Sequence, residues 1–199
     1  MALRTMKRRR RENRTDYKAR RLLLTSGIPR IVVRRTNKYF VLQAVESDEA
    51  QDKVVATITS KELLKNGWDE KKGGSLKSIP AGYLTGMLMA KKLGKGASPG
   101  ITSKKGTSGE VQSSSGKYIM DLGMTRTIAG SRVFAVVKGL IDGGFDISAN
   151  EKVFPSEERL NGEHLRGQSK TSLSPSADKS GMTKDDVKAM IAKIKGGLK

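Results

Sequence analysis

The residues of this chain best suited to chemistry are arginines near its amino end. Arg8, Arg9, Arg10 and Arg11 are consecutive, and residues 4–21 contain eight arginines against two lysines. A guanidinium group pairs bidentately with phosphate oxygens and stacks on planar groups, which a lysine ammonium does not do. The segment therefore predicts a nucleic-acid-binding arm and favours RNA as its ligand. The alternative is a basic run that serves targeting or solubility.

The distribution of charge supports this interpretation. The 199 residues carry 39 basic and 20 acidic side chains, a net of +19, and residues 1–38 hold 14 basic and 2 acidic side chains, a net of +12. Self-repulsion of this kind is relieved when a polyanion neutralises the charge and condensed counterions are released. Nucleic acid is thus the first candidate partner. An anionic membrane surface, or a general polycation role, is the alternative.

A second group of polar side chains falls in a short turn between two predicted strands. Arg34, Arg35, Asn37, Lys38 and Tyr39 combine cations, an amide and an aromatic ring. Such a tip could enter an RNA groove or clamp a bulge. The alternative is a solvated turn with the Tyr39 ring in the core.

Motifs that suggest catalysis fail on chemical grounds. Gly96-x-Ser98-x-Gly100 matches the spacing of the serine-hydrolase motif. In that motif the residue after the serine donates a backbone N–H to the oxyanion hole, and Pro99 has no N–H. The glycines there are also one residue away from the dinucleotide-binding fingerprint and follow a predicted helix. The single histidine, His164, has no indicated nucleophile as partner, so we expect it to be structural or an RNA neighbour.

Acidic residues offer one enzymatic alternative. Asp121 ends a predicted strand, and Asp142 and Asp146 lie along a predicted helix, so the three could form the cluster of a metal-dependent nuclease. Ordinary caps and surface charges explain them better, with Asp142 in a salt bridge. The chain has no cysteine, which excludes disulfides and thiolate metal sites. We expect no metal, no cofactor, no small-molecule substrate and no catalysis.

The apolar pattern predicts the elements that position these residues. Runs rich in β-branched residues predict strands at 30–35, 39–46 and 53–60. The first two strands form a hairpin, and the third has Val54, Ala56 and Ile58 on one face. A helix over about 80–93 has Pro80 in its first turn, and a strand at 117–122 follows.

Later segments are predicted to be mainly helical. Residues Val133, Val136, Val137, Leu140 and Ile141 recur at helical spacing after Ser131. The glycine pair at 143–144 ends this helix. A short helix follows the proline at 155, and a last one covers 184–195. The Ser/Lys-rich linker before it favours a loosely held tail or a partner-binding helix over core membership.

This order predicts an α/β domain of mixed α+β character: a layered mixed sheet with an antiparallel hairpin, a third strand, a crossover helix, and a further strand and helix. We divide the chain into a basic RNA-binding arm (1–25), a globular core (26–150) with a Gly/Ser/Lys-rich loop at 94–116, a short helix closing the core (151–167), a linker (168–182) and a basic C-terminal helix (183–199). There is no signal-peptide pattern at the amino end and no apolar run near the ~20 residues that span a bilayer. We therefore expect a cytoplasmic location and no membrane partner.

Several short motifs, taken in order, resemble one known family. They are RRRRENRTDY at 8–17, SGIPR at 26–30, RRTNKY at 34–39, NGW at 66–68, IPAGYLTG at 79–86, MDLG at 120–123, GSRVFA at 130–135 and GEHL at 162–165. Together they are similar to the archaeal and eukaryotic branch of the large-subunit ribosomal protein family that binds 5S rRNA. The resemblance covers about four-fifths of the chain.

The resemblance implies a structural role in the central protuberance of the large ribosomal subunit. There we expect the arm to hold 5S rRNA and touch 23S rRNA, with the other 5S-binding large-subunit protein as a neighbour. By position, the RNA-binding residues are Arg8, Arg9, Arg10, Arg11, Arg14, Lys18, Arg20, Arg21, Arg34, Arg35, Asn37, Lys38 and Tyr39, with Arg132 as a weaker member.

Overall fold

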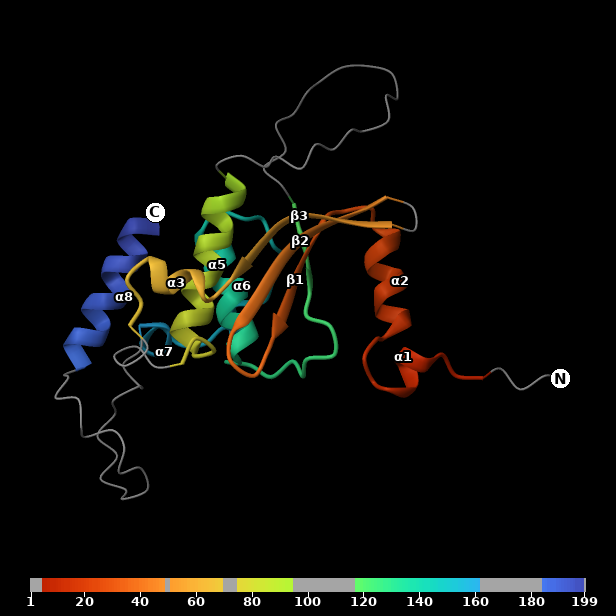
Figure 1. The fold of residues 1–199 in the computed structure, drawn as a ribbon, viewed down its shortest axis with the longest axis horizontal. Helices are drawn as coiled ribbons and strands as arrows, with labels where there is room; N and C mark the ends of the chain where they lie inside the picture. Colours follow the sequence, from red (N-terminus) through yellow and green to blue (C-terminus); the bar gives the residue numbers. More distant parts are fainter. Residues whose placement is uncertain (1–4, 49–50, 70–74, 95–116, 162–183, 199) are drawn as a thin grey trace, which may run out of the picture.

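A computed structural model describes residues 5–48, 51–69, 75–94, 117–161 and 184–198 (Figure 1). The predicted loop at 94–116 and linker at 168–182 lie almost wholly outside the described residues, as does His164. Four strands form one sheet: β1 (Arg30–Arg35), β2 (Phe40–Asp48), β3 (Gln51–Thr59) and β4 (Ile119–Asp121). The sheet confirms the mixed α/β fold class.

The sheet has the strand order β3-β2-β1-β4. Strand β1 pairs antiparallel with β2, as the predicted hairpin requires, and β3 pairs antiparallel with β2 on its other side. Strand β4 adds to β1 in parallel, with Ile31 opposite Met120. A parallel pair needs a crossover connection, and the chain between β3 and β4 includes the long helix α5 (Ile79–Gly94).

A bulge in β3 corrects one prediction. Ala44 of β2 pairs with Ala56, but the next residue, Val45, pairs with Val54, so Val55 is the extra residue. A one-residue insertion reverses which face each following side chain points to. Val55 and Ala56 therefore pack against the core, whereas Val54, predicted to share a face with Ala56, is 49% exposed.

Two helices cover the inner face of the sheet. Helix α6 (Arg132–Asp142) places its predicted stripe, including Val133, Val136 and Leu140, against Ile31 and Phe40 of the sheet. Its end at the glycine pair is also confirmed, because Gly144 has φ +98°, where L-residues are strained. Helix α5 has buried residues along nearly its whole length, since it lies among the sheet, α6 and the helices beyond.

Glycines set the distance between α5 and α6. A Cβ at Gly139 of α6 would lie 2.0 Å from the Tyr83 carbonyl oxygen, and a Cβ at Gly86 of α5 would lie 2.3 Å from the Val136 carbonyl oxygen. Contacts with main-chain atoms cannot be relieved by moving a side chain. The two helices therefore cross at a separation that only glycine permits at these positions.

The remaining elements close the side of α5 that faces away from the sheet. They are α3 (Glu62–Lys65), α7 (Glu157–Leu160) and α8 (Lys184–Leu198), and the 3₁₀ turn η1 (Glu151–Val153) precedes α7. Ile191 and Ile194 of α8 are buried with Leu84 and Met87 of α5. The expectation of a loosely held tail is therefore wrong: Ile191 and Ile194 belong to the core, because α5 presents an apolar second face that the sheet cannot cover.

We expect Gly139→Ala to destabilise the fold by about 1–3 kcal/mol, because the added methyl forces α5 and α6 apart. Urea unfolding measures this change. Gly196→Ala in α8 is the matched control, because a Cβ there meets nothing within 4 Å, and alanine improves helix propensity. Equal stability of the two variants would contradict a glycine-limited crossing.

Candidate nucleic-acid interface

The basic arm folds into two short helices, α1 (Arg8–Arg11) and α2 (Tyr17–Thr25). Asp16 caps α2, because its carboxylate accepts hydrogen bonds from the backbone N–H groups of Lys18 and Ala19 at 2.9 and 3.3 Å. Figure 1 shows the arm on the opposite side of the sheet from α5, α6 and α8. Neither helix buries a residue fully, although Leu23 and Leu24 of α2 are half-buried.

Charge within the arm is only partly paired. Glu12 approaches Arg8 at 3.8 Å and Arg14 at 3.3 Å, and both guanidinium groups remain exposed. Exposed pairs of this kind contribute little to stability. Arg10 and Arg11 have no ion pair with any carboxylate in the described part of the chain. The arm thus presents a surplus of positive charge to solvent.

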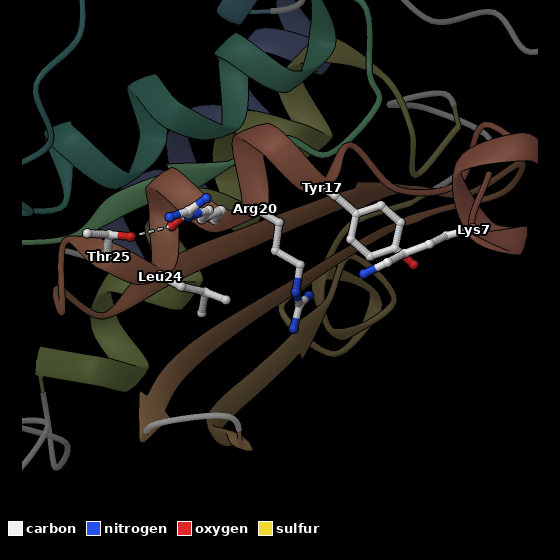
Figure 2. Close-up of a pocket in the computed structure, with 6 residues that line it drawn as sticks. Lys7, Tyr17, Arg20, Leu24 and Thr25 are labelled. Carbon is white, nitrogen blue, oxygen red and sulfur yellow. Dashed lines mark hydrogen bonds between the residues drawn. The ribbon is translucent and has the colours of Figure 1, made fainter. Parts of the chain in front are cut away.

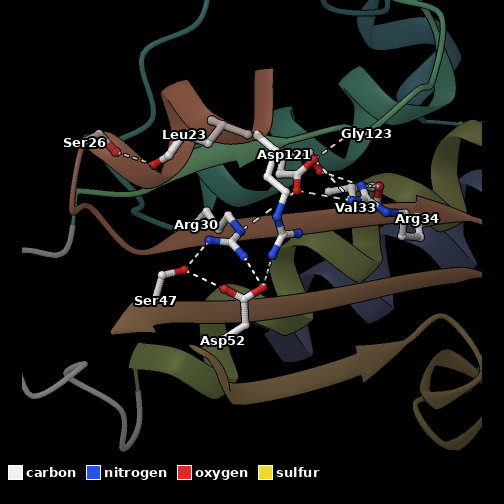
Figure 3. A network of polar contacts seen from close by, with 10 residues as sticks. Leu23, Ser26, Arg30, Val33, Arg34, Ser47, Asp52, Asp121 and Gly123 are labelled. Atoms are coloured by element: carbon white, nitrogen blue, oxygen red, sulfur yellow. Dashed lines mark hydrogen bonds and ion pairs between the residues drawn. The ribbon is translucent and has the colours of Figure 1, made fainter. Parts of the chain in front are cut away.

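An ion network joins the arm to the sheet (Figure 3). Asp52 of β3 accepts from Arg20 of α2 at 2.8 Å and from Arg30 of β1 at 2.8 Å. Ser47 of β2 donates to the other oxygen of Asp52 at 2.8 Å and itself accepts from Arg30. Arg30 is only 5% exposed, and a buried charge is tolerated only when it is paired in this way.

The network continues across the outer face of the sheet to β4. Arg34 holds both carboxylate oxygens of Asp121 at 3.2 Å and also donates to the Asp121 carbonyl. The Nε of Arg30 lies 4.0 Å from the same carboxylate. Backbone alternation explains this arrangement, because residues 30, 32 and 34 of β1 share one face. Arg34, predicted to contact RNA, therefore has a carboxylate partner within the protein.

The sequence did not reveal Arg30 and Asp52 as partners. Arg30 could have been placed on the same strand face as Arg34 by alternation alone. Asp52 had no such signal, because its pairing with Ser47 depends on the register of β2 and β3 and on the bulge between them.

The hairpin tip divides into exposed and packed residues. Arg35, Asn37 and Lys38 are exposed. Tyr39 is half-buried against the buried cluster that contains Leu84 and Met87 of α5, and the Lys61 ammonium lies 4.5 Å from its ring centroid. Among the described residues, no hydrogen bond or ion pair links this tip to the arm.

Arg132, the weaker member of the predicted set, lies exposed at the first turn of α6. The predicted set therefore falls into three separate places: the arm, the hairpin tip and this helix start.

The candidate nuclease carboxylates do not gather. Asp121 is held by Arg34, and Asp142 accepts from the Tyr83 hydroxyl at 2.8 Å and pairs with Lys138 at 3.1 Å, which confirms the predicted salt bridge of Asp142. Burial and the nearby Asp142 carboxylate raise the pKa of Tyr83 well above its usual range. Within the described ranges no group of three His, Cys, Asp or Glu side chains could hold a metal ion. No helix in those ranges is long and apolar enough to cross a membrane.

Acid should weaken the network through Asp52. Burial alone would raise the pKa of Asp52, but hydrogen bonds from Arg30, Ser47 and Arg20 lower it from 3.8 to about 2. A carboxyl that binds its proton more weakly in the folded state stabilises the fold above its unfolded pKa, and this stabilisation is lost as the pH falls from about 4 to about 2. We expect Asp52→Asn to cost about 1–3 kcal/mol near neutral pH and progressively less toward pH about 2.

Urea unfolding of both proteins across this pH range measures the difference. Asp48→Asn is the control, because Asp48 is exposed on the neighbouring strand and makes no ion pair with a described residue. A stability difference between wild type and Asp52→Asn that stays constant down to pH about 2 would contradict the role of the carboxylate.

Comparison with known proteins places this chain in a family. Residues 2–150 match the family described as ribosomal large subunit proteins 60S L5 and 50S L18. A protein of Methanoregula boonei named large ribosomal subunit protein uL18 is 40% identical over 158 residues, which cover 79% of each chain. The protein of the same name from Korarchaeum cryptofilum is 40% identical over 79% of this chain and 70% of its own. The chain therefore belongs to the uL18 family of structural, non-enzymatic proteins of the large ribosomal subunit.

Proposed function

We propose that this ribosomal protein binds 5S rRNA through its basic arm and helps to attach it to 23S rRNA in the central protuberance. The observation that carries the proposal is the unpaired charge of α1: Arg10 and Arg11 are exposed and lack a carboxylate partner within the described residues. Guanidinium groups free of protein partners are available to displace counterions from RNA phosphates, and that displacement supplies most of the affinity.

The ion network gives the arm a defined direction before RNA binds. The contact of Arg20 with Asp52 and, through it, with Arg30 relates the arm to the sheet. An arm held in this way loses less conformational freedom on binding than a free segment would. Phosphate contacts of this type position the protein and carry no sequence information by themselves.

The hairpin tip and the start of α6 extend the proposed interface. Arg35, Asn37, Lys38 and Arg132 are exposed and contribute cations and an amide. Arg34 and Tyr39 contribute less, because the first is held by Asp121 and the second packs on the core. The other 5S-binding protein of the large subunit is the proposed neighbour in the assembled particle.

We expect the double change Arg10→Gln and Arg11→Gln to weaken binding to 5S rRNA and to flatten its salt dependence. The slope of log affinity against log salt should fall in magnitude by roughly 0.7–0.9 for each phosphate that the variant no longer neutralises. Fluorescence titrations at several salt concentrations measure both effects. The control is Lys65→Gln with Lys152→Gln, two exposed lysines on α3 and η1, which removes the same charge elsewhere. Equal losses of affinity in both double variants would favour a general polycation.

We expect deletion of residues 1–21 to reduce 5S rRNA affinity much more than the double change does. The deletion removes all the arginines of the arm, including Arg20, the partner of Asp52. The core should still unfold cooperatively in urea, because neither α1 nor α2 contributes a buried residue. Unchanged affinity of a folded truncated protein for 5S rRNA would overturn the role given to the arm.

A further inference from the structure

Helix α2 carries a groove that the charge argument does not use. Six side chains line it, and five of them follow the helical spacing i, i+3, i+4, i+7 and i+8 along one face of α2. They are Tyr17, Arg20, Arg21, Leu24 and Thr25, joined by Lys7 from the segment before α1 (Figure 2). The groove is open to solvent and has a volume of about 520 Å³. That volume lies in the range, roughly 300–1,000 Å³, that accommodates one group of small-molecule size.

The apolar part of this helix is only partly covered by the protein. Helix α2 is amphipathic, but none of its residues is buried, and Leu22 is 66% exposed. Tyr17 and Leu24 are half-exposed at the groove. Arg20 on this face is linked to Asp52, and Tyr17 and Leu24 keep part of their apolar surface open to solvent.

The polar groups in the groove favour an anionic, aromatic ligand. The Lys7 ammonium lies 4.7 Å from the centroid of the Tyr17 ring, and Arg21 follows Tyr17 by one helical turn, so that both residues share a face. Arg20 is already held by Asp52, but Lys7 and Arg21 have no ion pair with a described residue. The Thr25 hydroxyl donates to the Arg21 carbonyl at 2.8 Å, which leaves its oxygen able to accept. No carboxylate of a described residue lines the groove.

We propose that this groove receives one unpaired nucleotide of 5S rRNA, with its base stacked on Tyr17 and its phosphate paired with Arg21 and Lys7. The inference rests on the proposed function and makes it more specific. Unpaired RNA bases commonly stack on aromatic side chains while cations follow the backbone. A peptide fits less well, because the groove offers two cations and no carboxylate, and its apolar surface is limited to one ring and Leu24.

Stacking and phosphate pairing have different signatures, and this separates them experimentally. Loss of one stacking ring costs about 5- to 150-fold in affinity, and because stacking releases no counterions, it leaves the salt slope unchanged. We therefore expect Tyr17→Ala in the full chain to bind a 5S rRNA transcript about 5- to 150-fold more weakly with an unchanged slope. Arg21→Gln should reduce the slope by roughly 0.7–0.9.

Three further variants separate a loss of affinity caused by the missing ring from one caused by a disturbed helix. Tyr17→Phe retains the ring and should bind like wild type. Tyr17→Leu retains apolar bulk and helix propensity but has no π-face, so it should lose affinity as Tyr17→Ala does. Leu22→Ala removes an exposed apolar side chain of the same helix that does not line the groove, and it should bind like wild type. Chemical probing of the transcript should show one unpaired base that wild type protects and Tyr17→Ala leaves reactive.

Several outcomes would overturn the inference. Wild-type affinity of Tyr17→Leu together with a loss for Tyr17→Ala would mean that the ring only packs. Wild-type affinity of both, while Arg10→Gln with Arg11→Gln still loses affinity, would remove the nucleotide site and leave the arm's role intact. Hydrogen-exchange protection of residues 17–25 by a 23S rRNA fragment or by another ribosomal protein, and not by 5S rRNA, would assign the groove to that partner.

Discussion

One carboxylate holds the basic arm to the rest of the molecule. Asp52 accepts hydrogen bonds from Arg20 of the arm and from Arg30 in the sheet, and Arg30 is almost completely buried. Removing a partner from a buried arginine is costly, because the remaining charge has neither water nor a counter-ion. The low pKa of Asp52 reflects the same contacts. Because α1 and α2 contribute no fully buried residue, this ionic connection is a direct link that relates the arm to the sheet.

The arginines fall into two groups, those paired with carboxylates of the protein and those without such a partner among the described residues. Arg20, Arg30 and Arg34 are held by Asp52 and Asp121 on the outer face of the sheet. Arg10, Arg11 and Arg21 have no ion pair with a described residue and remain exposed, as Arg35 does at the hairpin tip. A guanidinium that is ion-paired with a carboxylate stabilises the protein, whereas one without such a pair is available to bind phosphate. The net charge of the chain therefore overstates the charge that RNA encounters.

The sheet and its helices provide the rigid base that this network needs. The glycine-limited crossing of α5 and α6 fixes the inner face of the sheet, and the bulge at Val55 brings Asp52 opposite Ser47 on the outer face. If β3 were regular, Lys53 would occupy that position in place of Asp52, since one inserted residue shifts the register by one. The bulge in β3 thus decides which side chain of this strand reaches the arm.

The sequence by itself determined the family, the positions of the main strands and helices, and the concentration of charge at the amino end. The elements and the charge follow from local periodicity, from turn residues and from composition, and the family from the resemblance of its short motifs. None of these depends on contacts between distant residues. Only the tertiary structure decided that Arg34 is held by Asp121, that Ile191 and Ile194 pack on α5, and that Arg20 and Arg30 share Asp52. The contact between Arg20 and Asp52 joins residues 32 positions apart. Such partners are chosen by strand register and helix docking, and a linear pattern of residue types does not encode either one.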